Sequence, residues 1–350
     1  MLSLVGCDRN PMVKPAATTW MPDEAAPHDR TWMAFGASQR IWGRRLLGEV
    51  RHNLAAIAQA IARYEPVSML VRPEEYDLAA QMCGAFVDLV VAPLDDLWVR
   101  DTGPVFVKDG QGRLGGIDFN FNGWGQKQAH RHDAQVAELI IRRVGGKLIN
   151  TSLVLEGGAL EVDGEGTAII TESCVLNRNR NPGMTQADCE AILKPLLGLQ
   201  KIIWLPGIRG RDITDGHTDF YARFARPGVV VAGYEPDPNS FDHGVTKRHL
   251  DILRGSRDAH GRQLEIAVIE SPSRIRPRFE RAEFAAGYIN FYVVNGAVMA
   301  PEFGDAIADS RAQSILQDCF PNRDIIQLNI DGLAAGGGGI HCTTQQQPRL

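Results

Sequence analysis

The sequence predicts a mixed α/β fold in which five similar units close into a ring. Segments with strand and helix patterns alternate along all 350 residues, without a long linker. Most helical patterns follow two short strand candidates and precede a third, as in Ala159–Val162, Thr167–Thr171, helix and Lys201–Leu205. The helix midpoints recur about every 55–80 residues, which favours a circular, propeller-like array. A doubly wound parallel sheet is the alternative, but the hairpin-like strand pairs count against it.

Five helical patterns mark the units. They span Arg45–Tyr64, His132–Val144, Gln186–Leu197, Ser240–Leu253 and Ala306–Phe320. The first places apolar residues at helical spacing, namely Leu46, Leu47, Val50, Leu54, Ile57, Ala58 and Ile61. A sixth, Glu74–Gly84, follows Pro73, and proline is favoured at the first helical position. The last unit adds strand candidates at Asn290–Val294, Ala297–Ala300 and Asp324–Leu328.

The composition excludes several classes of protein. With 44% hydrophobic and 23% charged residues, the chain is neither disordered nor fibrous. A net charge of −5 gives no basic footprint for nucleic acid. No run of eighteen apolar residues occurs, so we expect no membrane span. The 36 glycines exceed the usual share and predict tight turns or loops beside a ligand.

The six cysteines lie at positions 7, 83, 174, 189, 319 and 342, without a C-x-x-C pair. This spacing predicts a reduced, cytoplasmic protein with neither a disulfide framework nor a zinc site. Export or lipid anchoring is the alternative if Leu4–Cys7 ends a truncated lipoprotein signal. We expect residues 1–19 to be disordered or a residual targeting segment, and residues 20–350 to form a single domain.

Polar residues flanked by glycine recur in loops after the closing strand of most units. These loops are Trp98–Pro104, Glu156–Gly158, Asp215–Asp219 and Gly336–Cys342. In a closed array such loops converge at one end of the central axis. The four motifs therefore predict one shared site.

Cys342 and His217 are the candidate reactive pair. Cys342 follows a four-glycine run, where backbone can approach a ligand closely, and a thiolate is a competent nucleophile. His217 suits proton transfer near neutral pH, and it shares one side with Asp219 if the segment is extended. We expect His341 to be structural, and we expect buried, structural thiols at Cys83, Cys174, Cys189 and Cys319.

Three carboxylates, Asp101, Glu156 and Asp219, would surround this thiol. They disfavour an anionic substrate and favour a planar cation such as guanidinium, whose donors match paired carboxylates. Trp98 is placed to stack on that cation. We expect no cofactor and no metal. The G-x-G-x-x-G match at Gly110–Gly115 leads into a strand pattern rather than a helix, so it is rejected as a phosphate site.

Taken in order, motifs from nearly the whole chain resemble the agmatine deiminases and the Porphyromonas-type peptidylarginine deiminases. The matching segments are Trp20–Glu24, His28–Met33, Trp98–Pro104, Leu155–Gly158, Asn177–Pro182, Gly216–Asp219, Tyr288–Tyr292 and Gly336–Gln346. The resemblance implies a five-bladed α/β propeller. It also implies cofactor-free hydrolysis of a guanidinium to a ureido product and ammonia, through a covalent thiouronium, as in polyamine metabolism.

The resemblance also implies a role for each site residue. Cys342 would be the nucleophile and His217 the general acid and base. Asp101 and Asp219 would hold the guanidinium nitrogens, and Glu156 would bind substrate and orient His217. Two further residues, Trp98 and Gly339, would complete the pocket on the substrate side.

The substrate is open at this point. Agmatine is favoured, yet many agmatine deiminases carry an acid four residues before the catalytic histidine, where this chain has Ile213. Asp212 or Asp215 is close by, and Arg274 or Arg281 could instead serve an arginine-type substrate. An arginine deiminase and an amidinotransferase are therefore the alternatives. The small cationic substrate is the only predicted partner, with no nucleic acid and no membrane, and a homodimer is compatible with the sequence.

Overall fold

The computed structural model describes residues 19–279, 281 and 283–350. The expectations for residues 1–18, including a lipoprotein signal that ends at Cys7, lie outside the described residues. Within the described chain, no helix combines the length and the apolar character needed to cross a bilayer.

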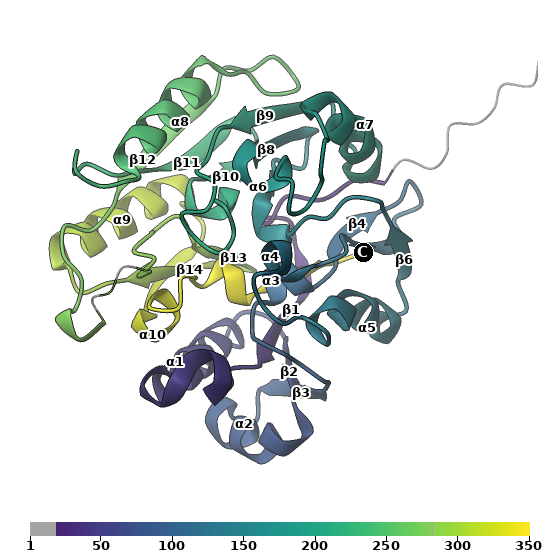
Figure 1. The fold of residues 1–350 in the computed structure, drawn as a ribbon, viewed down its shortest axis with the longest axis vertical. Coiled ribbons are helices and arrows are strands. Elements are labelled where there is room, and N and C mark those ends of the chain that lie inside the picture. Colours follow the sequence, from purple (N-terminus) through teal and green to yellow (C-terminus); the bar gives the residue numbers. More distant parts are fainter. Residues whose placement is uncertain (1–18, 280, 282) are drawn as a thin grey trace, which may run out of the picture.

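The described strands form five sheets, four of three strands and one of four. Figure 1 shows these sheets arranged in chain order around a common centre. Four sheets are consecutive in sequence: β4 (Val105–Lys108), β5 (Leu114–Asp118) and β6 (Lys147–Asn150); β7 (Leu160–Val162), β8 (Thr167–Thr171) and β9 (Lys201–Leu205); β10 (Ala222–Arg226), β11 (Val229–Tyr234) and β12 (Glu265–Glu270); β13 (Tyr292–Val294), β14 (Ala297–Glu302) and β15 (Asp324–Asn329). In each, an antiparallel pair is followed by a parallel one.

The remaining sheet joins distant parts of the chain. It is ordered β16 (Gln345–Pro348), β1 (His28–Phe35), β2 (Val67–Val71) and β3 (Val87–Val91). The contact between β16 and β1 is antiparallel, with Trp32 opposite Gln345. This pairing gives the sheet the same antiparallel and parallel pattern as the other four, and it places the segment after Cys342 beside the first strand.

A helix crosses over between the two parallel strands of each sheet, because parallel neighbours need a long connection. These helices are α1 (Gln39–Ile61), α5 (Val136–Val144), α7 (Gln186–Leu197), α8 (His243–Gly255) and α9 (Ala306–Cys319). The five predicted helices and the sixth, α2 (Tyr76–Cys83), are confirmed. The predicted doubly wound alternative is wrong, because every sheet contains an antiparallel pair.

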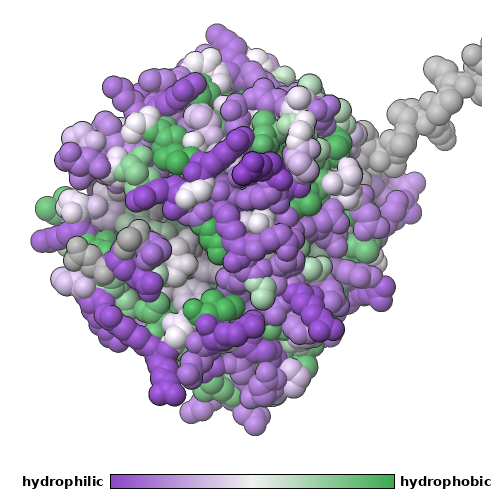
Figure 2. All heavy atoms as spheres, in the orientation of Figure 1, coloured by the Kyte–Doolittle hydropathy of each residue, from purple (hydrophilic) through white to green (hydrophobic). Residues whose placement is uncertain are grey.

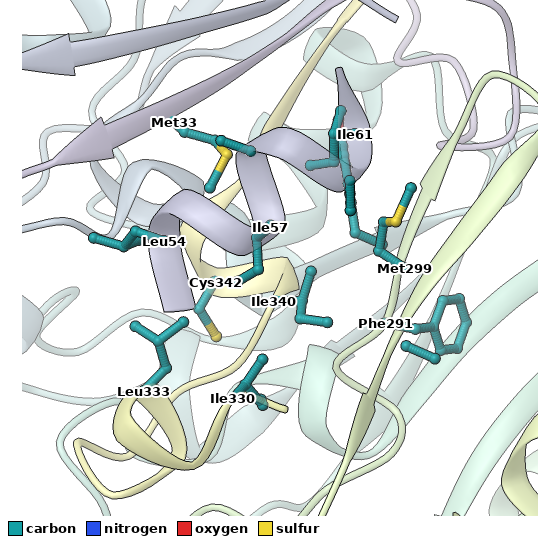
Figure 3. Packing of buried hydrophobic residues seen from close by; sticks show 14 of the residues in the cluster. Met33, Leu54, Ile57, Ile61, Phe291, Met299, Ile330, Leu333, Ile340 and Cys342 are labelled. Atoms are coloured by element: carbon teal, nitrogen blue, oxygen red, sulfur yellow. The ribbon is translucent and has the colours of Figure 1, made fainter. Parts of the chain in front are cut away.

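The largest apolar cluster lies beneath α1 and reaches the predicted nucleophile. Figure 3 shows Cys342 among the side chains of this cluster, together with Ile57 and Ile340. The visible outer face is mostly hydrophilic, with small separate apolar patches (Figure 2). The fold therefore places the Cys342 thiol between an apolar core and the polar loops around it.

Candidate active site

Each predicted site residue stands at the equivalent place in its own unit, just before the strand that starts the antiparallel pair. Asp101 lies in α3 (Val99–Thr102) ahead of β4, and Glu156 precedes the short helix η3 (Gly157–Ala159) ahead of β7. His217 and Asp219 lie at η4 (Thr218–Phe220) ahead of β10, and Cys342 lies in η6 (His341–Thr343) ahead of β16. The repeated architecture therefore brings residues from four units to one place.

Gly158 shows how closely three of these residues meet. A Cβ atom added there would stand 2.6 Å from His217 Nδ1, 2.9 Å from Asp101 Oδ1 and 3.1 Å from Asp219 Oδ2. The backbone N–H of Gly158 also donates to Asp101 Oδ1 at 3.2 Å. Glycine is needed at this position because the site atoms occupy the space of any side chain. The predicted convergence of the three loops is confirmed by this contact.

Glu156 and His217 form a buried pair that is held from behind by Arg180. His217 Nε2 lies 3.1 Å from Glu156 Oε2, and Arg180 Nε donates to both carboxylate oxygens at 2.8 and 2.9 Å. Burial works to raise the pKa of Glu156, but Arg180 and His217 outweigh it and hold that pKa below its usual value. Glu156 therefore stays ionised and keeps the proton on Nε2, which leaves Nδ1 to face the other carboxylates.

The carboxylates also affect the charge of His217. Burial works to lower its pKa, but Asp101, Cys174 and Glu156 together raise that pKa well above the usual value. An imidazolium is therefore favoured in the unliganded site. Such a group can donate a proton to a leaving amine.

Two buried polar atoms in this site lack a hydrogen-bond partner among the described residues. They are His217 Nδ1, which lies 3.7 Å from Asp101 Oδ1, and Asp219 Oδ1. A buried polar group without a partner costs about 1–3 kcal/mol, so such atoms point to a missing ligand. Asp101 has donors from Trp124 Nε1 at 2.9 Å and from the backbone, yet burial raises its pKa to about 6. The carboxylates of Asp101 and Asp219 therefore suit a cation with several N–H donors.

Cys342 lies beside the same carboxylates. Its Sγ is 3.7 Å from Asp219 Oδ2 and accepts a hydrogen bond from Asn290 Nδ2 at 3.3 Å. Burial, followed by the negative charges of Asp219 and Asp101, raises the pKa of the Cys342 thiol well above its usual value. A protonated thiol is therefore favoured, and a bound cation would favour its ionisation.

Asn290 completes the set of equivalent positions, and sequence reasoning missed it as a site residue. It precedes β13 in the remaining unit, and its Oδ1 accepts from the backbone N–H of Cys342 at 3.3 Å. A Cβ at Gly339 would stand 2.4 Å from Asn290 Oδ1, so glycine is required there for Asn290 to reach the thiol. Gly339, predicted to bind substrate, has this packing role. The recurrence of polar residues before each first strand is the signal that points to Asn290.

Trp98 lies against the glycine loop that leads to Cys342. A Cβ at Gly338 would stand 2.3 Å from its ring, and Trp42 lies beside it with ring centroids 5.7 Å apart. Both indoles are buried, and Trp42 Nε1 donates to Asp96 at 2.8 Å. The rings of Trp42 and Trp98 therefore pack against the glycine loop, consistent with the predicted place of Trp98 at the pocket.

A second thiol, Cys174, lies at the other side of His217. Its Sγ is 3.4 Å from Glu156 Oε2, and burial raises its pKa to about 11. It is buried as expected, but it contacts the site, which sequence reasoning missed. Ligand atoms of Glu156, Cys174 and His217 lie within 4.8 Å of one another, close enough to hold a metal ion. Both Glu156 oxygens already accept from Arg180, so the carboxylate is not free for that purpose.

Lys127 holds the loop that precedes His217. Lys127 Nζ donates to the Ile213 carbonyl at 2.9 Å and to Asp215 Oδ2 at 2.8 Å. Asp215 also accepts from Arg180 at 2.8 Å and from Asn179 at 3.1 Å. Asp215 is thus committed to holding the loop. Arg281, considered above for an arginine-type substrate, pairs with Glu283 at 3.2 Å.

Comparisons with a family profile, with related sequences and with solved structures each match nearly the whole chain. The profile of the family described as Porphyromonas-type peptidyl-arginine deiminase matches residues 20–348. A protein of Streptomyces coelicolor is 43% identical over 337 residues, which cover 94% of this chain and 98% of that protein. An agmatine deiminase of Stutzerimonas stutzeri is 38% identical, with 94% of this chain and 95% of that protein covered.

Solved structures share the mixed α/β fold. An agmatine deiminase of Enterococcus faecalis superposes with a TM-score of 0.89 at 30% sequence identity, and the match covers 96% of this chain and 99% of that chain.

Proposed function

The chain belongs to the Porphyromonas-type peptidyl-arginine deiminase family, and from this we propose that it is an agmatine deiminase. It hydrolyses the guanidinium of agmatine to N-carbamoylputrescine and ammonia, and is thus a hydrolase that acts on C–N bonds. The observation that carries the proposal is the buried, unpartnered carboxylate oxygen Asp219 Oδ1 next to the Cys342 thiol, with the Asp101 carboxylate at the same site. A guanidinium supplies the donors and the positive charge that this site lacks.

We propose that the five sheets are the blades of a closed five-bladed propeller, formed as one domain by residues 20–350. Two observations support this arrangement. Every sheet repeats the same antiparallel and parallel order, and the contact between β16 and β1 joins the last segment to the first. The site then lies where the loops before the first strands meet.

We propose Cys342 as the nucleophile rather than Cys174. A nucleophile must lie on the side of the imidazole where the carboxylates hold the substrate. Cys342 is near Asp219, whereas Cys174 lies beside Glu156 on the Nε2 side of His217. Cys342 also retains 6% exposure, while Cys174 is fully covered. The position of the two thiols relative to His217 therefore favours Cys342.

The first half of the reaction follows from these contacts. The guanidinium lies between Asp101 and Asp219, and its charge favours transfer of the Cys342 proton to water. The thiolate attacks the central guanidinium carbon, a C–S bond forms, and the C=N electron pair moves to nitrogen. Protonated His217 gives its proton to one amino group, the C–N bond breaks, and ammonia leaves. A covalent thiouronium on Cys342 remains.

In the second half of the reaction, the same imidazole acts as a general base rather than as a general acid. Neutral His217 accepts a proton from water as the water oxygen attacks the thiouronium carbon. The C–S bond then breaks, its electron pair returns to sulfur, the sulfur takes up the hydroxyl proton of the adduct, and the neutral ureido product is released. Glu156, held by Arg180, keeps the imidazole oriented in both halves.

A substrate panel tests the proposal. Agmatine, free arginine, acylated arginine and methylated guanidines are each incubated with the protein, and ammonia and the ureido product are measured. The highest kcat/KM is expected for agmatine, without an acceptor amine. A preference for arginine or acyl-arginine would show that agmatine is not the substrate. A requirement for an acceptor amine would indicate an amidinotransferase instead.

A further inference from the structure

We infer that Glu24 and His341 form a relay that positions Asp219 for the substrate. The inference rests on the proposed deiminase function and adds two positioning residues to it. Glu24 lies in the segment that precedes β1, 195 residues before Asp219 in sequence, and His341 directly precedes Cys342. The relay thus connects a remote segment of the chain to the reacting groups.

The geometry of the relay is continuous. His341 Nδ1 lies 2.7 Å from Asp219 Oδ2, and His341 Nε2 lies 2.9 Å from Glu24 Oε2. All three side chains are buried. From the sequence we expect only a structural role for His341. The η6 turn at His341–Thr343 instead lets His341 and Cys342 both contact the Asp219 carboxylate.

Glu24 fixes the proton on one side of the imidazole. Its carboxylate accepts from Arg100 Nη2 at 3.1 Å and from the backbone N–H of Val293 at 2.8 Å, and Arg223 Nη2 forms an ion pair with it at 2.8 Å. Burial works to raise its pKa, but Arg223, His341 and Arg100 hold that pKa well below the usual range. An ionised Glu24 can only accept, so His341 Nε2 is the donor.

The other side of the imidazole then acts on Asp219. At 2.7 Å, one proton must lie between His341 Nδ1 and Asp219 Oδ2, and this bond fixes the plane of the carboxylate. With Oδ2 held in this way, Oδ1 is the oxygen without a partner and is available to the guanidinium. Without His341, the Asp219 side chain could rotate and lose this orientation.

Two substitutions of His341 separate positioning from simple packing. In His341→Asn, the amide nitrogen can replace Nδ1 and donate to Asp219, but the shorter side chain does not reach Glu24. In His341→Leu, both hydrogen bonds are lost while most of the volume remains. We expect kcat/KM to fall in the order wild type, His341→Asn, His341→Leu, with a total loss of about 10- to 100-fold for the last.

Direct binding supplies a readout that does not depend on turnover. In the Cys342→Ser background, agmatine affinity measured by calorimetry should weaken for His341→Leu by about 10-fold. His249→Asn is the matched control, because His249 is also buried but lies outside the site on α8. It should lower the melting temperature without changing agmatine affinity. Equal affinities for His341→Leu and its parent would overturn the relay.

Nitrogen NMR of labelled histidine tests the relay itself, with the His341 signal assigned from the His341→Asn spectrum. A proton on Nε2 is expected, and an unprotonated Nε2 would overturn the inference because that atom would face an ionised carboxylate. The two proposals fail in different ways. Absence of turnover by wild type on every guanidine would overturn the function, whereas normal turnover by His341→Leu would overturn only the relay.

Discussion

Arg180 binds Glu156 through a single nitrogen that donates to both carboxylate oxygens, at 2.8 and 2.9 Å. Both side chains are buried, and the same guanidinium donates to Asp215 at 2.8 Å. Arg180 therefore ties the acid behind His217 to the loop that carries His217. Its hydrogen bonds to the site are those to Glu156 and to the loop that carries His217, so its influence on catalysis passes through these two contacts.

Arg180→Gln should weaken catalysis and shift the acid limb of the pH profile of kcat/KM. Glu156 has a lowered pKa in the folded protein. Its ionised form therefore contributes fully above the ordinary pKa of a glutamate, and this contribution is lost as the pH falls through the lowered pKa of the folded state. Loss of Arg180 removes a main cause of the lowering. We expect the acid side of the kcat/KM profile to shift to higher pH and the maximum to fall about 10-fold or more. An unshifted acid limb would contradict the role given to Arg180.

Removal of the two site thiols should have different effects. Cys342→Ala should abolish turnover and retain agmatine binding, because the bond-forming atom is lost while both carboxylates remain. Cys174→Ser should retain the covalent chemistry with a smaller loss, since Cys174 Sγ contacts only the Glu156 side of His217. Mass spectrometry of quenched reactions should find the thiouronium on residue 342. Cys189→Ala, buried in α7 outside the site, is the control.

If Cys174→Ser were the inactive variant and Cys342→Ala turned over agmatine, the nucleophile would have to be reassigned. The structure already shows why Cys174 was not separable from a core cysteine by sequence. Its neighbours in the chain are apolar or small, and its contact with Glu156 depends on the packing of α6 (Glu172–Val175) against a different loop.

Gly158→Ala should remove activity at small cost to folding outside the site. The added methyl would stand within about 3 Å of His217 Nδ1, Asp101 Oδ1 and Asp219 Oδ2, where it displaces the atoms that hold the substrate. We expect kcat/KM to fall by about 100-fold or more. Gly48→Ala is the matched control, because a Cβ in that part of α1 meets nothing within 4 Å. Activity of Gly158→Ala close to that of Gly48→Ala would contradict the geometry of the site.

Local sequence signals predicted the regular elements well. The bounds of α7 agree with the prediction, and its start is explained by the capping box between Thr185 and Asp188. Helix α1 begins six residues before its predicted start, and the chain has a positive φ of 64° at Gly43, where the helical pattern is interrupted. The periodic residues lie after that glycine. Periodicity could therefore identify the helix but not its first turn.

The site was predictable only where a motif carried its chemistry. Cys342, His217 and the three carboxylates stood beside glycines, and their loops converge as expected. Asn290 and His341 were not identified because their roles depend on contacts across sheets. Neither an asparagine ahead of an apolar strand nor a histidine next to a cysteine indicates by itself which groups it contacts in the fold.

Asp101→Asn should weaken substrate binding while making the Cys342 thiol more acidic. Asp101 is one of the two carboxylates placed to bind the guanidinium, so its neutral amide should raise KM by about 10-fold or more. The same charge contributes to the raised pKa of Cys342, after burial and Asp219, so its removal should lower the thiol pKa. Iodoacetamide alkylation of residue 342, followed against pH by mass spectrometry in the absence of substrate, measures that shift.

The opposite directions of these two effects distinguish Asp101 from a residue that only supports the fold. A folding defect would lower the apparent kcat through loss of folded protein and expose every buried thiol to alkylation, including Cys189, whereas a local charge effect changes residue 342 alone. Asp88→Asn, an exposed position on β3, supplies the control for loss of one negative charge elsewhere. If alkylation of Cys342 in Asp101→Asn followed the wild-type pH curve, the carboxylate would not control the thiol, and the substrate would have to promote its ionisation by another route.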